Sequence, residues 1–526
     1  MMKQHTTFLF RIGFIYLIFT SGLLSCNNKK EIEVEKINET SYLLHINAPG
    51  KYILLPIEES AGESQVMLRG ESKESVPMNI RISTTKTDYY VPFELPTGKK
   101  NNTIEIYTPT TDPLLWDHIQ ISDTFDTCNR EKFRLLYHHT PTYGWMNDPN
   151  GMVYLDGEYH LFYQYNPYGS MWGNMHWGHA ISKDLIQWEQ LGVAICPDTL
   201  GTIFSGNCII DKKNTAGFGE NAMIAFYTSA GEKQTQSIAY STDKGRTFTK
   251  YDKNPVVTAD IPDFRDPNVF YHEPTGKWIM VIAAGQEVQL YSSGNLLDWE
   301  YESSFGEGYG NHGGVWECPD LLELPVDGNP ENKKWVLLLN INPGGIFGGS
   351  ATQYFTGEFD GKVFTCESTP TTEKWMDWGK DHYATVTWAN APGNRSIAIA
   401  WMSNWQYANQ LPTLQFRSAN SVPREISLYT YDNETYLMNQ PVKELVALRK
   451  NTQSHPVVVV DRYKPFNIDS LLEENEAIAF TNCPNVRELE RIFPLTMVES
   501  KGFKDTCIMA FPIPNKEKES SIPVKE

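Results

Sequence analysis

Short runs in which polar residues alternate with β-branched or aromatic residues follow one another through the first quarter of the chain. They cover residues 41–46, 51–55, 78–83 and 103–107, and Gly, Pro and Asn stand between them. Alternation with a period of two is typical of strands that bury one face, and short strands separated by turn residues are typical of a β-sandwich. The pattern therefore predicts an N-terminal β-sandwich-like domain over residues 26–126.

A second pattern begins near residue 130 and consists of a polar turn that ends on an aromatic residue. It occurs four times, ending at Trp188, Phe248, Trp299 and Phe364, at intervals of 60, 51 and 65 residues. Such an interval accommodates four short strands with their turns, and units of this kind close into a propeller around an axis. Because residues 130–430 have room for five units, we expect an all-β chain with a five-bladed β-propeller there.

The strand pattern becomes thinner from residue 436 onward. Helical spacing is limited to residues 442–449, and residues 515–526 are charged and contain proline, which is typical of a frayed tail. We expect a short, incomplete C-terminal β-sandwich over residues 436–526, whose missing strands would leave a sheet edge unpaired.

The amino terminus has the composition of an export signal. Lys3 and Arg11 precede an apolar run over residues 12–24 that is too short to span a bilayer. The run ends on Leu-Leu-Ser-Cys, which resembles the bacterial lipobox whose cysteine receives lipid. We expect residues 1–25 to be a signal peptide and Cys26 to anchor the exported protein to a bacterial membrane, at the cell surface or facing the periplasm. The alternative is an ordinary cleaved signal with an incidental cysteine.

Charge and cysteine content exclude several partners. The chain has 64 acidic residues against 45 Lys and Arg, with a formal net charge of −19, whereas phosphate backbones are bound by clustered basic residues. Nucleic acid is therefore not an expected partner. The cysteines other than Cys26 are scattered and form no C-x-x-C pair. Neither a disulfide framework nor a zinc site is indicated, and no metal or cofactor is expected.

Three acidic residues stand in constrained, aromatic-rich segments. Asp148 lies in Trp-Met-Asn-Asp-Pro-Asn-Gly, Asp266 in Phe-Arg-Asp-Pro, and Glu317 in Val-Trp-Glu-Cys-Pro. A proline fixes the backbone beside Asp148, the neighbouring Arg265 would keep Asp266 ionised, and apolar neighbours would raise the pKa of Glu317 toward that of a general acid. Each segment alone also reads as an ordinary turn, surface pair or strand end.

The spacing of these acids favours a common site. Asp148 and Asp266 are 118 residues apart, about two propeller units, and Asp266 and Glu317 are 51 apart, about one. Equivalent strands of a propeller end at its axis, so residues whole units apart can meet there. A fixed carboxylate beside a protonated carboxyl group is the machinery that cleaves glycosidic bonds with retention.

At these residues the chain resembles glycoside hydrolase family 32, the invertase, inulinase and levanase family. The family motifs W-M-N-D-P-N-G, R-D-P and E-C-P occur here intact and in that order. Secondary segments of the family pattern stand at residues 164–167, 172–179, 204–206, 381–384 and 400–405. The resemblance covers residues 135 to about 425.

The resemblance implies a role for each acid: Asp148 as nucleophile, Glu317 as acid/base, and Asp266 as the transition-state stabiliser that binds fructose hydroxyls. It implies hydrolysis of β-fructosyl bonds in levan- or inulin-type fructans and in sucrose, without a metal or cofactor. Because a propeller funnel forms a pocket more readily than a cleft, we expect fructose to be released from chain ends. The residues implied to line the subsite for the terminal fructosyl unit are Asn147, Gln164, Trp172, Phe204, Ser205, Arg265, Trp401 and Trp405.

Several alternatives remain open at this point. An endo-levanase or a fructosyltransferase would carry the same catalytic residues, and a non-catalytic fructan-binding lipoprotein would keep the fold. Residues 241–248 also resemble the Asp-box of sialidases, although a single box and few arginines argue against that class. The additional N-terminal domain could replace the shortened C-terminal module by packing on the propeller, space the enzyme from the membrane, or bind glycan.

Overall fold

The computed structural model describes residues 31–69, 76–96, 102–109, 114–127 and 131–449. Within these residues strands dominate, and the helical elements are one five-residue α-helix and three short 3-10 helices. The prediction of an all-β chain is confirmed. The predicted signal peptide, Cys26 and residues 450–526 of the predicted C-terminal sandwich lie outside the described residues.

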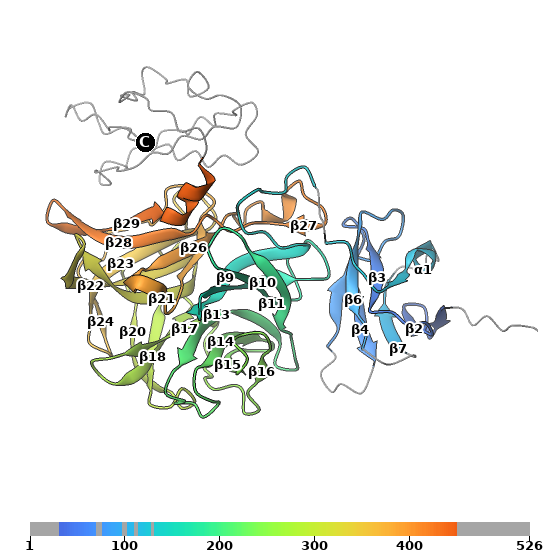
Figure 1. The fold of residues 1–526 in the computed structure, drawn as a ribbon, viewed down its shortest axis with the longest axis horizontal. Helices are drawn as coiled ribbons and strands as arrows, with labels where there is room; N and C mark the ends of the chain where they lie inside the picture. Colours follow the sequence, from blue (N-terminus) through green and yellow to red (C-terminus); the bar gives the residue numbers. More distant parts are fainter. Residues whose placement is uncertain (1–30, 70–75, 97–101, 110–113, 128–130, 450–526) are drawn as a thin grey trace, which may run out of the picture.

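Two sheets form the N-terminal part of the structure and share one hydrophobic core (Figure 1). Its elements are β1 (Ile32–Lys36), β2 (Ser41–Ile46), β3 (Tyr52–Ile57), β4 (Ser64–Arg69), β5 (Met78–Ile80), β6 (Tyr89–Glu94), β7 (Asn102–Tyr107), α1 (Leu114–His118) and β8 (Gln120–Ser122). One sheet has the order β1-β2-β7-β4-β5 and the other β6-β3-β8. Alternation along β2 and β7 buries Leu44, Ile46, Ile104 and Ile106 completely.

Three sheets of consecutive antiparallel strands follow. The first contains β9 (Gly144–Leu155), β10 (Glu158–Asn166), β11 (His176–Ser182) and β12 (Glu189–Ile195), and β27 (Phe416–Arg417) adds to β9 in parallel. The second contains β13 (Thr202–Asp211), β14 (Ala222–Ala230), β15 (Gln234–Ser241) and β16 (Thr249–Lys250). The third contains β17 (Phe264–His272), β18 (Lys277–Ala284), β19 (Val288–Ser293) and β20 (Glu300–Phe305).

The remaining strands form one larger sheet. They are β21 (Val315–Val326), β22 (Asn329–Asn342), β23 (Ala351–Phe359), β24 (Phe364–Cys366), β25 (Tyr383–Thr387), β26 (Ile397–Trp401), β28 (Arg424–Tyr431) and β29 (Glu434–Pro441). The 3-10 helices in this region are η1 (Pro392–Asn394), η2 (Ala408–Gln410) and η3 (Lys443–Leu448). Strands β21 and β28 are joined by a single parallel pair, Val326 with Leu428. The predicted C-terminal module begins at residue 436, which lies in β29, paired with β28.

The strands β9, β13, β17, β21 and β25 hold these sheets together. Each contacts the next in that order, and β25 contacts β9. Each also carries one residue more than the strand paired with it, at 147–148, 205, 266–267, 318–319 and 384–385 respectively. An extra residue of this kind is a β-bulge, which bends the strand and re-aims the neighbouring side chains.

The four polar turns recognised in the sequence occupy equivalent places. They connect β11 to β12, β15 to β16, β19 to β20, and β23 to β24. In each, one side chain accepts two backbone N–H groups from residues two to four positions ahead, at 2.8–3.0 Å; these side chains are Asp184, Asp243, Asn295 and Asp360. The repeat therefore has a physical basis, since the same Asx capping closes each turn.

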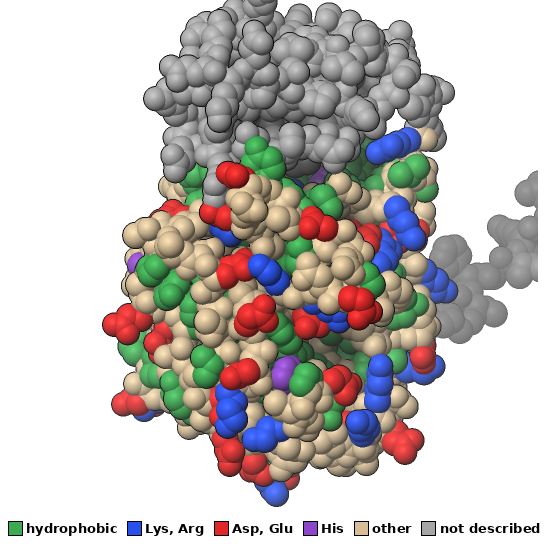
Figure 2. Space-filling view, turned by 90° about the vertical axis from the view of Figure 1, so that its left-hand side faces the viewer, with side chains coloured by type: hydrophobic (Ala, Val, Ile, Leu, Met, Phe, Trp, Pro, Cys, Tyr) green, Lys and Arg blue, Asp and Glu red, His purple; other side chains and the backbone are tan. Residues whose placement is uncertain are grey.

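One face of the molecule is seen in Figure 2, from the side on which β22 and β24 lie in Figure 1. On the coloured part of that face, acidic and basic side chains are mixed and apolar ones are scattered. The coloured part of this face shows no broad basic area of the kind that binds phosphate backbones.

Candidate active site

The three acids singled out in the sequence converge at the bulges of the central strands. Asp148 lies on β9, Asp266 on β17 and Glu317 on β21, each within or next to the extra residue of its strand. A void of about 10 Å³, near the lower limit for holding one water molecule, lies beside Asp266 and is lined by residues of all five central strands. Strands far apart in the sequence therefore meet at this point.

Asp148 is held by three donors. Its Oδ1 accepts a hydrogen bond from Asn147 Nδ2 at 2.9 Å, and its Oδ2 accepts from Ser205 Oγ at 2.8 Å and from Cys318 Sγ at 3.4 Å. Asn147 is in turn fixed by Trp145, whose indole N–H donates to Asn147 Oδ1 at 2.8 Å. A carboxylate bonded on both oxygens is oriented without help from a ligand.

Asp266 shares a partner with Asp148. Its Oδ2 accepts the backbone N–H of Cys318 at 2.9 Å and lies 3.5 Å from Cys318 Sγ. Asp266 and Cys318 both adopt left-handed backbone, with φ of 64° and 44°. Thr228 Oγ1 accepts the backbone N–H of Asp266 at 2.9 Å and holds that unusual conformation. The Cys318 sulfur thus lies between the two carboxylates.

Arg265 does not pair primarily with its neighbour Asp266, which corrects the expectation from the sequence. Its guanidinium donates to Glu317 Oε1 at 2.9 Å and to Asp263 Oδ1 at 2.6 Å, whereas Nε lies 3.9 Å from Asp266 Oδ2. The physical reason is that the bulge turns Asp266 toward Cys318 and leaves the long Arg265 side chain beside Glu317 on the next strand.

The three carboxyl groups differ in acidity. Burial, together with the charges of Asp266 and Asp148, raises the pKa of Glu317 to about 8, although Arg265 opposes the increase. Burial and the charge of Asp148 raise the pKa of Asp266 to about 6, against the effect of Arg265. Burial also raises the pKa of Asp148, while Asn147, Ser205 and Cys318 lower it.

These values qualify the expectations drawn from the sequence. The pKa of Glu317 is higher than that of Asp266, as a proton donor requires. The cause is its burial beside other carboxylates rather than Trp316, which is fully buried in a separate core cluster. Asp266 is less acidic than expected because burial outweighs the more distant Arg265, yet it remains mainly ionised at neutral pH.

Aromatic side chains form a wall beside the acids. The ring of Trp172, whose residue is 46% exposed, lies 6.3 Å from Phe204 and 6.5 Å from Trp405, both edge-on. Trp405 stacks on Trp145 at 5.9 Å. Trp401 was expected to line the subsite, but it is completely buried behind Trp405 at 4.8 Å. It therefore supports the wall and does not line it.

Gln164 is a further member of the predicted set, and its side chain has an unsatisfied hydrogen-bond donor. It lies on β10 with 2% exposure, and its Nε2 group has no hydrogen-bond acceptor within the described part of the chain. A buried donor without an acceptor is unfavourable, so a ligand oxygen or a water molecule would stabilise this site. Ser205, also predicted, is buried and bonded to Asp148.

Sequence reasoning missed Cys318 and Asp263. Cys318 stands inside the quoted Glu-Cys-Pro segment, where a thiol next to the predicted acid was the available signal. Asp263 lies two residues before Arg265 and pairs with it, and the Asp263 side chain is 40% exposed. No sequence pattern distinguishes Asp263 from an ordinary surface acid. Both were overlooked because their importance comes from partners on other strands or from the local bend.

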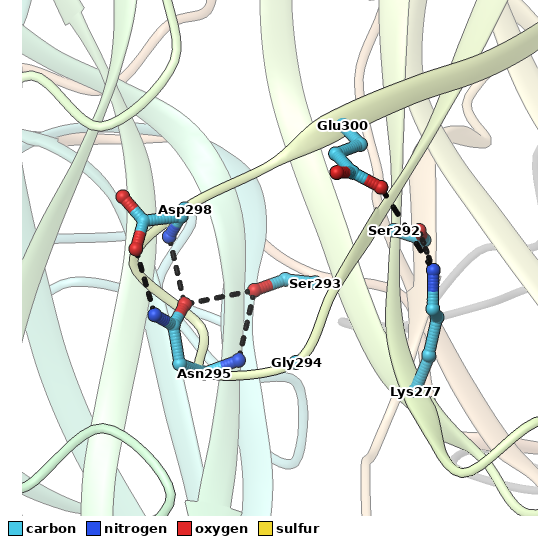
Figure 3. A pocket seen from close by; sticks show the side chains of 7 residues that line it. All are labelled: Lys277, Ser292, Ser293, Gly294, Asn295, Asp298 and Glu300. Atoms are coloured by element: carbon cyan, nitrogen blue, oxygen red, sulfur yellow. Dashed lines mark hydrogen bonds and ion pairs between the residues drawn. The ribbon is translucent and has the colours of Figure 1, made fainter.

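A second hollow, of about 330 Å³, lies at the β19–β20 turn (Figure 3). Asn295 bonds there to Ser293 and Asp298, and Lys277 donates to Ser292 at 3.1 Å. These polar groups are satisfied by one another, and no predicted site residue lies among them. The hollow lies at one of the four capped turns and is not the candidate active site.

Two further observations concern the described residues. They contain no group of three or more His, Cys, Asp or Glu side chains arranged to hold a metal ion. None of their helices is long and apolar enough to cross a membrane.

Comparison with known proteins identifies two regions. Residues 138–441 match the family model described as glycosyl hydrolases family 32 N-terminal domain. Residues 38–137 match a model described as a domain of unknown function, DUF4980. The first match contains the three acids and the aromatic wall.

Individual relatives agree with the family match. Over 326 residues the chain is 55% identical to a levanase of Bacillus subtilis (strain 168), covering 61% of this chain and 48% of the levanase. Over 350 residues it is 43% identical to an extracellular exo-inulinase of Aspergillus niger, covering 59% of this chain and 65% of that protein. The chain thus spans about half the length of the levanase and about two thirds of the exo-inulinase.

A solved structure is also similar. The crystal structure of an exo-inulinase from Aspergillus awamori superimposes with a TM-score of 0.59 at 40% sequence identity. The match covers 64% of this chain and 72% of that chain.

The charge of Arg265 should control the titration of Glu317. Arg265→Ala removes the cation that lowers the pKa of Glu317, so we expect the midpoint to rise by about 1–2 pH units from its value near 8. Arg265→Lys keeps the charge and should shift it less. The measurement is the pH dependence of the carboxyl band by infrared spectroscopy, with Glu317→Gln identifying the band. An unchanged or lowered midpoint in Arg265→Ala would contradict this assignment.

Proposed function

This chain belongs to glycoside hydrolase family 32, and on that premise we propose that it hydrolyses the β-fructosyl bonds of levan- or inulin-type fructans and of sucrose. The observation that carries the proposal is the difference in acidity within one carboxyl cluster. Glu317 has a pKa raised to about 8, whereas that of Asp266 is about 6 and Asp148 is held by three donors. Groups whose surroundings separate their pKa values are suited to opposite roles in acid–base chemistry.

In the proposed first step, Asp148 attacks the anomeric carbon of the fructosyl unit. The bond between that carbon and the leaving oxygen breaks, and the oxygen takes the proton of Glu317. Two properties support Asp148 as the nucleophile: its donors favour the ionised form, and they fix the direction of the attacking oxygen. Glu317, whose pKa is about 8, is protonated at neutral pH before this step.

In the second step, water gives a proton to Glu317 and attacks the anomeric carbon, which releases Asp148. Formation of the covalent bond removes the negative charge of Asp148, one of the charges that raise the pKa of Glu317. The pKa of Glu317 therefore falls in the intermediate, when the residue must act as a base. The cluster itself supports this change of role.

Asp266 and the aromatic wall would bind the fructosyl unit. An ionised Asp266 can accept hydrogen bonds from two neighbouring hydroxyl groups, which strengthen as charge develops on the ring. Gln164 Nε2 can donate to a third oxygen, and Trp172, Phe204 and Trp405 can contact the apolar face of the sugar. Asn147, Ser205 and Arg265 would act by orienting Asp148 and Glu317.

We propose exo action, in which fructose is released from chain ends. A site at the end of a central axis forms a pocket more readily than an open cleft. We also infer a five-bladed propeller, with the eight-stranded sheet counted as two blades. The cyclic contacts of β9, β13, β17, β21 and β25 support this count, as does the single pair that joins β21 to β28.

The export and anchoring of the protein are likewise proposals. The order of a basic start, an apolar run and Leu-Leu-Ser-Cys supports a signal peptide over residues 1–25 and lipid on Cys26. The enzyme would then act on polymeric substrate outside the cytoplasm, held to a bacterial membrane at the cell surface or facing the periplasm.

The assay that tests the function uses the purified protein with levan, inulin and sucrose, with products resolved by chain length. We expect fructose to be the product at all degrees of conversion. Oligosaccharides as early products would overturn exo action, and products longer than the substrate at high sucrose would identify a transferase. No product from any of the three substrates would refute the hydrolase proposal and favour a binding protein.

Single substitutions should separate the three acids. Asp148→Asn and Glu317→Gln are expected to lower kcat on a fructan by at least about 10³-fold, because each removes one of the two reacting carboxyl groups. Asp266→Asn should lower kcat by about 10²–10³-fold while the melting temperature stays within a few degrees. Asp243→Asn, the same change at a capped turn, is the control and should keep normal turnover. Near-normal activity of Asp148→Asn would exclude it as the nucleophile.

Lipid attachment is tested by Cys26→Ala in a bacterial host fed with labelled palmitate. The wild-type protein should carry label and sediment with membranes, whereas the variant should do neither, because its acceptor thiol is absent. Cys196→Ala removes an exposed cysteine elsewhere and should behave as wild type. Equal labelling of Cys26→Ala and wild type would exclude the anchor.

A further inference from the structure

The segment 167–175, which connects β10 to β11, contacts the N-terminal sheets. Tyr168 packs against the N-terminal core and its ring lies 5.1 Å from Phe93. Near the other end, Asn174 accepts the backbone N–H of Asn79 at 2.8 Å and donates to Asn79 O at 2.6 Å. The N-terminal domain therefore holds the segment at both ends.

Glu59 is the charged centre of this contact. Its carboxylate accepts hydrogen bonds from the Ser170 hydroxyl, from Tyr89 Oη at 3.2 Å and from Arg417 Nη2 at 3.1 Å. Tyr89 Oη also accepts the backbone N–H of Ser170 at 3.0 Å. Glu59 thus links a side chain of the segment with a residue of β27.

Arg417 continues the connection toward the active site. The side chain of Arg417 is only 3% exposed, and it donates to Ser170 O at 3.0 Å, Asn409 O at 3.1 Å and Thr413 O at 2.7 Å. Asn409 Oδ1 accepts the backbone N–H of Trp172 at 3.3 Å. A guanidinium buried to this degree needs a compensating anion, and Glu59 supplies it.

Trp172 stands in the middle of the same segment and faces the other way. It is 46% exposed and forms the aromatic wall with Phe204 and Trp405. One side of the segment is therefore bonded to the N-terminal domain, while its other side presents a ring to the candidate active site. An exposed ring on a connecting loop keeps one orientation only if the loop itself is fixed.

We propose that the N-terminal domain is part of substrate recognition, and that Glu59 is the positioning residue that fixes Trp172 through Ser170, Arg417 and Asn409. This inference rests on the proposed function for the identity of the substrate. The ordering of residues 167–175 by Glu59 does not depend on the proposed function, because it is the same whatever the ligand is. The domain then does more than space the enzyme from a membrane.

The kinetic test compares Glu59→Ala with wild type on a fructo-oligosaccharide. We expect KM to rise about tenfold, because charge-assisted hydrogen bonds are lost behind the binding wall, and kcat to change by less than about twofold, because the three acids are untouched. In a Trp172→Ala background, Glu59→Ala should add little to KM, since two residues that act through one contact are not additive. Additive effects, or a loss in kcat alone, would overturn the positioning role.

A second readout does not depend on turnover. Hydrogen exchange of the full chain should show faster exchange over residues 167–175 in Glu59→Ala, with the β13–β16 sheet unchanged. Unchanged exchange in that segment would overturn the proposal even if the wild-type protein is an active fructanase. Faster exchange in a chain whose wild type has no activity on any fructan would instead count against the proposed function and leave the positioning role supported.

Two variants complete the design. Glu63→Ala removes an exposed carboxylate of the same domain that pairs with Arg81 at 3.6 Å, and should leave both readouts as in wild type. Glu59→Gln keeps the shape and one acceptor oxygen but removes the charge, and should give changes in the same direction but smaller. If Glu59→Ala does not fold, Glu59→Gln carries the test under the same criteria. Faster exchange without a change in KM in an active enzyme would show that recognition does not need the ordered segment.

Discussion

The candidate active site depends on the extra residues that β-bulges add to the central strands. In a regular strand, neighbouring side chains point to opposite faces, so adjacent residues cannot both face the site. The bulges break this rule, and Asp266 and Cys318 adopt left-handed backbone there. Asp148, Asp266 and Cys318 are each followed by proline, which has no N–H to leave unpaired where the register shifts. The backbone, more than any rotamer, therefore aims the acids.

Gathering three carboxyl groups in a buried place has a chemical consequence. Each negative charge disfavours the others, and burial disfavours all of them, so their pKa values rise unless donors offset the effect. Asp148 receives three donors, Asp266 receives the N–H of Cys318, and Glu317 has Arg265. Because burial and the charges of Asp266 and Asp148 outweigh the effect of Arg265, Glu317 is the group that holds a proton most readily among those with stated values. The geometry that brings the acids together thus also distinguishes them.

Local patterns in the sequence predicted the local features of this chain. Contacts between residues far apart in the sequence could not be predicted from such patterns. The spaced aromatic turns located four equivalent connections because Asx capping acts within four residues. The joining of β21 to β28 rests on one pair of residues about 100 positions apart, which no period reveals. Trp401 was misplaced for the same reason: a motif shows that an aromatic residue is present, but its burial depends on Trp405 and Trp145 packed around it.

The two matched regions meet between residues 137 and 138. A stabilising ion pair nevertheless joins residues from the two regions. Glu59 and Arg417 are 358 residues apart and form a largely buried ion pair. Removing either partner would leave an uncompensated buried charge at the base of the segment that carries Trp172. A catalytic domain without its N-terminal partner would retain all three acids but expose Arg417, Ser170 and Asn174. Similarity to a family thus locates the candidate chemistry, while the surroundings of Trp172 depend on contacts that join the two matched regions.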